Sequence, residues 1–393
     1  MQLMSQVIDD RQISRARLAV TITFLINGFC AGAFVARIPD FKKILDVSNG
    51  TLGASLLCVS IGVFLALRPA GRNSARFGSQ PVIFLGTIAL AFSLPLVGAL
   101  FSLQWLWFSF FIFGFCMATQ DVAMNAHAVL LEQRAGRRLM SVFHAMFSVG
   151  TLAGGILGGA LSQWKVSPLR QFLILLMVIL FLAFLLKPLF LSAEADKHPI
   201  EKGLKVRHPI IFWVLGIFGL CAALSEGAAG DWGGVLARET FSATPFVSTL
   251  PYIVFCSAMI IGRFSGDYLA HRFGASRIIM IGGVVSGSGL LSGLVIGGIP
   301  ALMVAWFLLG IGLSVVIPLM FSAAGTMATR QYAGVIAPSE AVAKVSGVSY
   351  FGFVIGPPLI GFLADVVQLR WALLLNVLLS YLLIFAARYA KSA

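Results

Sequence analysis

Long apolar stretches separated by short polar gaps fill almost the whole chain. Twelve of them reach about 20 residues, the length at which an α-helix crosses the bilayer core. The first half predicts spans at 17–36, 50–68, 81–100, 104–131, 139–162 and 170–190. The second half predicts spans at 209–230, 246–268, 277–297, 301–328, 341–365 and 371–390. The pattern therefore predicts an all-α membrane protein with twelve transmembrane helices.

A short sequence motif follows a predicted span once in each half of the chain. Ala75–Gly78 reads Ala-Arg-Phe-Gly and His271–Gly274 reads His-Arg-Phe-Gly, an offset of 274 − 78 = 196 positions. A second echo, offset by 202 positions, pairs two sets of glycines: Gly150, Gly154 and Gly159 with Gly352, Gly356 and Gly361. Duplication of an apolar chain is typical of secondary transporters built from repeats.

The repeat predicts two pseudo-symmetric six-helix bundles. Residues 1–190 should form the first and residues 209–393 the second. Between them lies the longest polar stretch, 191–208, which we interpret as a cytoplasmic linker. Of the 28 Lys and Arg residues, 21 lie in or near gaps that are cytoplasmic if both termini are inside, so the positive-inside rule predicts cytoplasmic termini.

Composition supports a membrane protein and argues against several other classes. Hydrophobic residues make up 59% and charged residues 11% of the chain, against roughly 45–50% and 25% in soluble domains. The basic residues that give the net charge of +13 lie in the short gaps between apolar stretches. This distribution is typical of residues that set the orientation of membrane helices, so no nucleic-acid partner is expected. All five cysteines fall in apolar stretches without a C-x-x-C pair, so no metal site is expected. Without a nucleotide loop or a nucleophile triad, we expect no cofactor and no enzyme activity.

Asp121 is the clearest candidate for a functional residue inside the membrane. An ionisable group at bilayer depth usually faces a cavity or a partner. Gln120 is adjacent to it, and Asn125 follows at i+4 on the same helical face. We predict that Gln120, Asp121 and Asn125 bind solute and that Asp121 binds the coupling proton. The alternative is a buried tie between helices.

Glu226 is the second membrane carboxylate, late in the seventh span. The small residues Gly227–Gly230 follow it, and they allow the opened helix that transport sites use. We predict that Glu226 contacts solute and exchanges a proton. Trp232 is either a stacking surface for a sugar ring or an anchor at the membrane interface.

Further polar side chains in the spans are candidates for lining a solute cavity. Asn27 lies in the first span, His144 near the start of the fifth, and Tyr350 in the eleventh. We predict solute contacts for all three. Each has a structural alternative, because polar side chains also join helices inside membranes.

Charged residues at the span ends are candidates for gates. These are Arg37 on the outer side and Arg76, Glu132, Arg134 and Arg272 on the cytoplasmic side. For Arg37 the alternative is a solvated loop, in which Pro39 ends the helix of the first span. Three further prolines should kink spans ten and eleven: Pro318, Pro357 and Pro358.

The chain resembles the major facilitator superfamily in its twelve spans, its two halves and its repeated basic hinge. The family hinge commonly reads G-x-x-x-D-R-x-G, and here Gly71–Gly78 carries Ala75 at the acidic position. In the second copy, His271 takes that place. The resemblance implies alternating access, in which the two halves rock about a site near the membrane midplane.

Five segments resemble the MosC/YbjJ-like branch of that superfamily, which is distantly similar to fucose permeases: Phe34–Pro39, Asp121–Asn125, His144–Gly155, Glu226–Trp232 and Gly356–Leu359. The resemblance implies a secondary active transporter in a bacterial inner membrane. We expect a monomer that moves a small polar organic solute, sugar- or inositol-like, with a proton. The alternative of the same fold is an exporter of drugs or metabolites, because Phe and Met are abundant.

Overall fold

The computed structural model describes residues 10–136, 139–195, 209–332, 336 and 338–389. These residues form helices joined by short loops, and no β-strand occurs among them. The chain divides into two compact units, Met1–Arg37 with Cys58–Lys202 and Ile38–Leu57 with Gly203–Ala393. Most of the expected linker, residues 196–208, lies outside the described residues.

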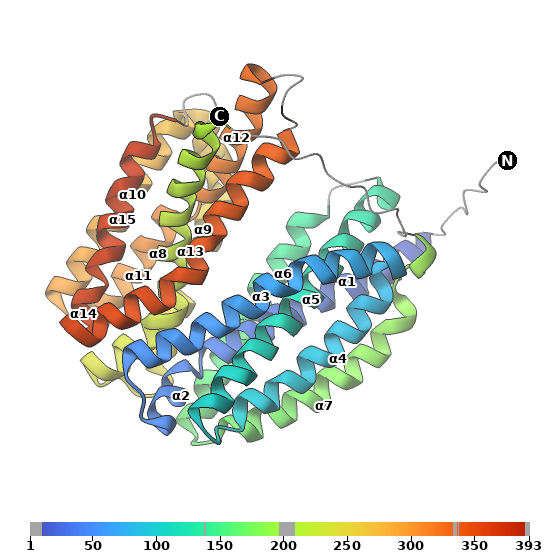
Figure 1. Ribbon diagram of the computed structural model, residues 1–393, viewed down its shortest axis with the longest axis horizontal. Helices are drawn as coiled ribbons and strands as arrows, with labels where there is room; N and C mark the ends of the chain where they lie inside the picture. The colour runs from blue at the N-terminus through green and yellow to red at the C-terminus, as the bar shows by residue number, and fades with distance from the viewer. Residues whose placement is uncertain (1–9, 137–138, 196–208, 333–335, 337, 390–393) are drawn as a thin grey trace. The chain divides into compact units, whose positions relative to one another are not determined.

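The first unit contains α1, most of α3, and α4 to α7 (Figure 1). The helices are α1 (Asp10–Val35), α3 (Asn49–Phe77), α4 (Ser79–Gly98), α5 (Leu103–Ala135), α6 (Met140–Gln163) and α7 (Pro168–Leu186), followed by the short turns η1 (Lys187–Leu189) and η2 (Ala193–Ala195). Within this unit α1 packs along α6, and α4 packs against both α5 and α7.

The second unit contains α2, the first turns of α3, and every later helix. The helices are α2 (Ile38–Leu45), α8 (Ile210–Phe241), η3 (Val247–Thr249), α9 (Leu250–Phe273), α10 (Ala275–Ile296), α11 (Ile299–Leu313), α12 (Val316–Gln331), α13 (Pro338–Val367), α14 (Leu369–Ala372) and α15 (Leu374–Ala386). Here α8 packs along α13, and α10 packs against α11 and α15.

Among the described residues, 12 helical segments are long and apolar enough to cross a membrane, which confirms the predicted number of spans. The tenth span is divided into α11 and α12, with the break at Ser314 and Val315. Pro318 explains the position, because a proline ring clashes with the carbonyl four residues earlier and lacks the N–H that would bond to it. Helix α13 continues through Pro357 and Pro358.

The repeated hinge has the same backbone conformation in both units. Gly78 separates α3 from α4 with φ 84°, and Gly274 separates α9 from α10 with φ 86°. A residue with a Cβ atom rarely adopts such positive φ values, so glycine is required where each helix stops. The second glycine echo also has a structural reason. Gly150 approaches the backbone of α1, and Gly352 approaches the backbone of α8, without room for a side chain.

One side of α7 shows how the helices meet lipid. Its exposed side chains are large and apolar: Leu173, Ile174, Met177, Val178, Phe181, Phe184 and Leu185. A soluble protein rarely exposes so continuous an apolar face. The side chains of Phe172, Leu175 and Ile179 on the same helix are buried in the unit. The apolar exposed face is therefore a lipid-facing surface.

Candidate functional site

Asp121 and Asn125 form a polar pair on α5, as their spacing predicts. The Asn125 side-chain amide donates to the Asp121 backbone carbonyl at 2.9 Å and to its Oδ1 at 3.1 Å. Both residues are partly exposed and lie near the middle of a helix of membrane-spanning length. A carboxylate in this position has one oxygen oriented by the amide and can take a proton or accept a solute hydroxyl.

Asn27 and Gln120 lie apart from that pair, in a buried network between helices. Asn27 Nδ2 donates to Gln120 Oε1 at 2.8 Å, and Gln120 Nε2 donates to the Thr87 hydroxyl at 2.6 Å. All three residues are buried, and the bonds join α1, α5 and α4. This arrangement is the interhelical tie that the sequence analysis kept as an alternative for such residues. Their predicted contacts with solute remain untested.

His144 is exposed in the first turns of α6. Its ring meets the edge of Phe24 from α1 at a centroid distance of 5.3 Å. The imidazole is therefore exposed on the surface of the unit, while one side of the ring contacts a buried aromatic side chain. Its predicted contact with solute stays a prediction.

Glu226 forms an ion pair with Arg263 inside the second unit. Arg263 Nη2 lies 3.3 Å from Glu226 Oε1, and the two side chains are 50% and 23% exposed. Each residue lies near the middle of its helix, α8 or α9. Asp231 lies on α8 and Tyr252 on α9, two helices that pack against each other. Several polar and charged groups are therefore distributed along two adjacent helices of this unit.

Tyr350 and Trp232 have opposite environments. Tyr350 is 52% exposed and stands in an aromatic row between Phe321 and Phe353, with centroid distances of 6.1 and 6.2 Å. Trp232 is fully buried, and its ring packs where a side chain on Gly361 would lie. A fully buried indole offers no face for stacking a sugar ring in this conformation. Its predicted contact with solute therefore requires a rearrangement.

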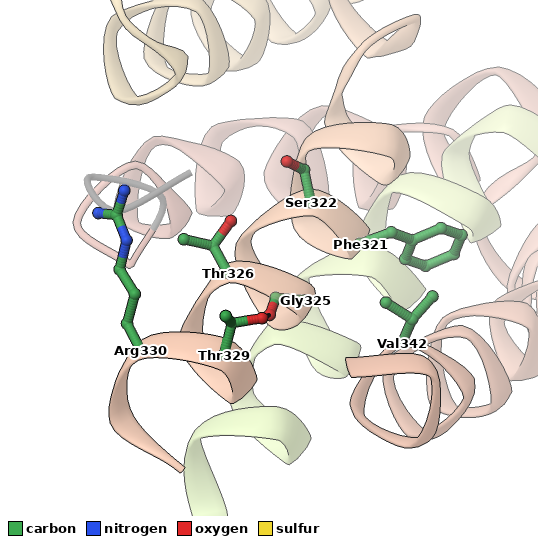
Figure 2. A pocket seen from close by; sticks show the side chains of 7 residues that line it. All are labelled: Phe321, Ser322, Gly325, Thr326, Thr329, Arg330 and Val342. Carbon is green, nitrogen blue, oxygen red and sulfur yellow. Dashed lines mark hydrogen bonds between the residues drawn. The ribbon is translucent and has the colours of Figure 1, made fainter. Parts of the chain in front are cut away.

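A pocket of about 550 Å³ opens between α12 and α13 in the second unit. Figure 2 shows hydroxyl side chains following α12, with Arg330 at the end of the row and Val342 contributed by α13. The lining residues are Phe321, Ser322, Gly325, Thr326, Thr329, Arg330 and Val342. One aromatic ring, three hydroxyl groups and a cation can together contact a small hydroxylated molecule.

Glu132 caps a neighbouring helix from the C-terminal end of α5. Its Oε2 accepts hydrogen bonds from the backbone N–H groups of Leu139 at 2.6 Å and Met140 at 3.1 Å. These groups begin α6, where unsatisfied donors and the helix dipole favour an anion. Arg134, predicted with Glu132 as a gate residue, is exposed.

Replacing Glu132 with alanine is expected to lower the free energy of unfolding by roughly 1–2 kcal/mol, the usual effect of removing a charged helix cap. Chemical unfolding of purified protein in detergent measures the change. Arg134→Ala at the same end of α5 is the matched control and should have little effect. Equal losses in both variants would show that the cap contributes nothing specific.

The hinge arginines lie over neighbouring aromatic rings. The Arg76 guanidinium lies 5.0 Å from the centroid of the Phe77 ring. Arg272 donates to the Tyr268 hydroxyl at 2.8 Å and lies 5.4 Å from the Phe273 ring centroid. Both arginines are exposed at helix ends. Their predicted roles as gate residues are untested.

Arg37 is buried, so the solvated loop considered in the sequence analysis is wrong. Its Nε donates to Gln171 Oε1 at 2.7 Å and its Nη2 donates to the Val166 carbonyl at 2.9 Å, all within the first unit. The next residues form α2 in the second unit. There Asp40 pairs with Arg238 and Lys42 pairs with Glu239, both on α8.

Hydropathy and spacing did not single out several residues that the structure connects. Arg238 follows the predicted span 209–230. Its partner Asp40 could not be identified from the sequence, because it lies about 200 positions earlier in the chain. His127 is buried on α5, where its Nε2 accepts from the Leu191 N–H at 3.2 Å and its Nδ1 lies 2.6 Å from the Ser79 hydroxyl. Since Nε2 accepts, the ring proton is on Nδ1 and donates to Ser79. Among the described residues, no three His, Cys, Asp or Glu side chains gather to hold a metal ion.

Comparison with known proteins gives a consistent set of similarities. The family model described as Major Facilitator Superfamily matches residues 20–336 and 215–392. The chain is 31% identical over 363 residues to an uncharacterised MFS-type transporter of Yersinia pestis, covering 91% of each chain. It is 28% identical to the membrane protein MosC of Rhizobium meliloti, covering 91% of this chain and 85% of that protein.

The fold is also similar to a solved structure. The nucleoside transporter NupG superposes with a TM-score of 0.78, covering 96% of this chain and 99% of that one. At 13% sequence identity, this likeness concerns the fold alone. Together with the MosC similarity, it agrees with the resemblance that the repeated hinge and the branch segments indicated.

Proposed function

Because the chain belongs to the major facilitator superfamily, we propose that this multi-pass membrane transporter is a secondary active transporter of a small polar organic solute. Sugar-like and inositol-like molecules are the proposed solute class. Alternating access of the two bundles is the proposed mechanism, with a proton as the coupling ion. The chain is not an enzyme, in keeping with its family.

Two partly exposed carboxylates near the middle of membrane-length helices carry this proposal. Asp121 is oriented by Asn125, and Glu226 is paired with Arg263. A carboxylate at bilayer depth is costly, so its presence there is best explained by a function that wets and dries its surroundings. Asp121 and Glu226 are the proposed proton-binding groups.

The remaining site assignments follow from exposure. His144 and Tyr350 are open enough to contact solute as they stand. Asn27, Gln120 and Trp232 are buried, so their proposed contribution is to hold the helices that carry the exposed groups. The hydroxyl row of Ser322, Thr326 and Thr329 supports a hydroxylated solute more than a lipophilic drug.

Cellular placement is part of the proposal. We propose that the protein is a monomer in the bacterial inner membrane, as the family resemblance implies. The Lys and Arg distribution supports cytoplasmic termini. Residues 1–190 and 209–393 are the proposed functional halves, joined by 191–208. The proposed gate residues are Arg37, Arg76, Glu132, Arg134 and Arg272.

A ligand screen tests the proposed solute class. Purified protein is heated with sugars, polyols, amino acids and antibiotics, since a ligand that binds the native state raises the melting temperature. We expect hydroxylated solutes to raise it, and the best of them to enter proteoliposomes. Stabilisation by lipophilic cations alone, with resistance on overexpression, would instead establish the exporter of the same fold.

Filling the pocket beside α12 should reduce transport without unfolding the protein. A Cβ atom on Gly325 would lie 3.7 Å from Val342, an ordinary contact, so Gly325→Ala should behave like wild type. Gly325→Phe places a ring in the pocket and is expected to lower the initial uptake rate roughly tenfold, equivalent to about 1.4 kcal/mol. Uptake and melting temperature are measured together. Unchanged uptake by the phenylalanine variant would remove this pocket from the solute path.

A further inference from the structure

Arg263 is a half-exposed cation on α9, near the end of the membrane-length segment Val247–Gly266. Its contact with Glu226 joins one guanidinium nitrogen to one carboxylate oxygen at 3.3 Å. A guanidinium has five N–H donors in a planar fork that matches a carboxylate in two parallel bonds. The contact with Glu226 is longer than a usual charge-assisted hydrogen bond and joins one atom of each group, so this carboxylate does not fill the fork.

The face of α9 that carries Arg263 has two further polar groups. Tyr252, Cys256 and Arg263 share one side of the helix, because the spacings of four and seven residues return to the same face. The three groups extend along about 16 Å of α9, which packs against α8. A cation, a thiol and a phenol on α9 therefore lie beside a helix that carries the carboxylates Glu226 and Asp231.

We propose that Arg263 binds an anionic group of the solute, and that Glu226 is the resident counter-ion which the solute's carboxylate displaces. The inference rests on the proposed transport function and narrows its solute class to acidic hydroxylated molecules, such as sugar acids. In the empty site Glu226 neutralises Arg263. In the loaded site the two oxygens of the incoming carboxylate occupy the fork.

Cys256 supplies a reporter at the site. The partly exposed thiol lies on the Arg263 face, and its alkylation by N-ethylmaleimide can be followed by mass spectrometry of its peptide in the unaltered chain. Cys58, also partly exposed but in the first unit, is the internal control. The probes are gluconate with sorbitol and glucuronate with glucose, each an anion matched to a neutral molecule, at constant ionic strength.

Gluconate or glucuronate should slow alkylation of Cys256 and leave Cys58 unaffected, while the neutral partners have little effect. At about 20 mM probe and a dissociation constant of about 5 mM, the slowing would be roughly fivefold. Absence of protection by both acids, or equal protection by their neutral partners, overturns the proposal. Taking the ratio of alkylation rates with and without probe within each variant cancels differences in intrinsic thiol reactivity between variants.

Variants separate a solute ligand from a structural ion pair. Arg263→Gln should abolish protection by the acids, and Arg263→Lys should retain part of it. Glu226→Gln should retain or strengthen protection, because the competing carboxylate is gone. Arg272→Gln, at the end of the same helix, is the matched control. Loss of protection in Glu226→Gln equal to that in Arg263→Gln would show that the pair is structural and would refute the assignment.

The proposal and the transport function fail in different ways. If wild-type protein transports a neutral sugar and Arg263→Gln transports it equally well, the transport function stands and the anion site is wrong. If no solute of any charge crosses proteoliposomes, the transport function itself fails.

Discussion

Gly154→Leu is expected to prevent the accumulation of folded protein. A Cβ atom on Gly154 would collide with the backbone of Phe29 and Ala33 on α1, and Gly150 meets the same helix one turn earlier. The contacts are reciprocal, because Gly28 of α1 meets the backbone of Phe147 on α6. Backbone cannot move aside as a flexible side chain can, so a leucine must separate the two helices. The expected loss is at least about 4 kcal/mol, in the range found only for severe core disruption.

Fluorescence-detected gel filtration and thermal unfolding measure this effect. Gly154→Ala should give a smaller loss in the same direction. Gly71→Leu is the matched control in the same unit, because no atom lies within 4 Å of a Cβ placed there. If Gly154→Leu elutes and melts as Gly71→Leu does, the described packing of α1 on α6 is incorrect.

Arg238→Met is expected to destabilise the second unit by about 3–5 kcal/mol, the usual result of removing one partner of a buried ion pair. Arg238 and Asp40 are 13% and 12% exposed, and Arg238 also donates to the Ser248 hydroxyl at 2.9 Å. Methionine keeps much of the volume and leaves the Asp40 carboxylate without this cation. Because α2 is held on α8 through this pair, the variant should also loosen Ile38–Leu45.

A double variant shows whether the loss comes from the uncompensated charge. Asp40→Asn with Arg238→Met removes both charges and should regain most of the lost stability. Lys42→Met breaks the neighbouring pair with Glu239. The Glu239 side chain is 40% exposed, so this variant should lower the free energy of unfolding by under about 1 kcal/mol. Melting temperature and hydrogen exchange of α2 are the measurements. A loss for Lys42→Met as large as that for Arg238→Met would contradict the importance of burial.

Sequence reasoning predicted the spans and the repeat because both depend on local composition. About 20 apolar residues form a membrane helix whatever their partners are. Gly78 and Gly274 stop their helices with the same positive φ, so the repeated motif indicated repeated structure. Pro318 likewise predicted the break that precedes α12, since its effect is confined to one helical turn.

The short helix α2, of eight residues, was not predicted, and a solvated loop was one alternative considered for this part of the chain. Its pattern does carry a signal: Ile38, Phe41 and Leu45 recur at helical spacing, and Ile38 and Phe41 are buried. The burial of Arg37 was beyond prediction. Its partner Gln171 lies 134 positions away, and hydropathy contains no information about such pairs.

The candidate site was predictable in residue type but not in pairing. Asp121 and Asn125 could be joined from sequence because an i+4 spacing fixes their geometry on one helix. Glu226 could be singled out as a membrane carboxylate, yet Arg263 looked like part of the basic hinge. Only the packing of α9 against α8 brings that cation to the carboxylate. Trp232 was predicted to be either a stacking surface or an interfacial anchor. It is buried against Gly361 of α13, a helix far along the chain that packs along α8.

The most direct measurement is solute-driven proton movement in lightly buffered proteoliposomes. The solute that best stabilises the protein is added outside, and external pH is followed alongside uptake of labelled solute. The account predicts that wild-type protein makes the outside more alkaline as solute enters, and that Asp121→Asn or Glu226→Gln slows this proton movement at least about tenfold. Solute uptake accompanied by unchanged proton movement in both variants would contradict the central claim that these two membrane carboxylates couple solute to protons.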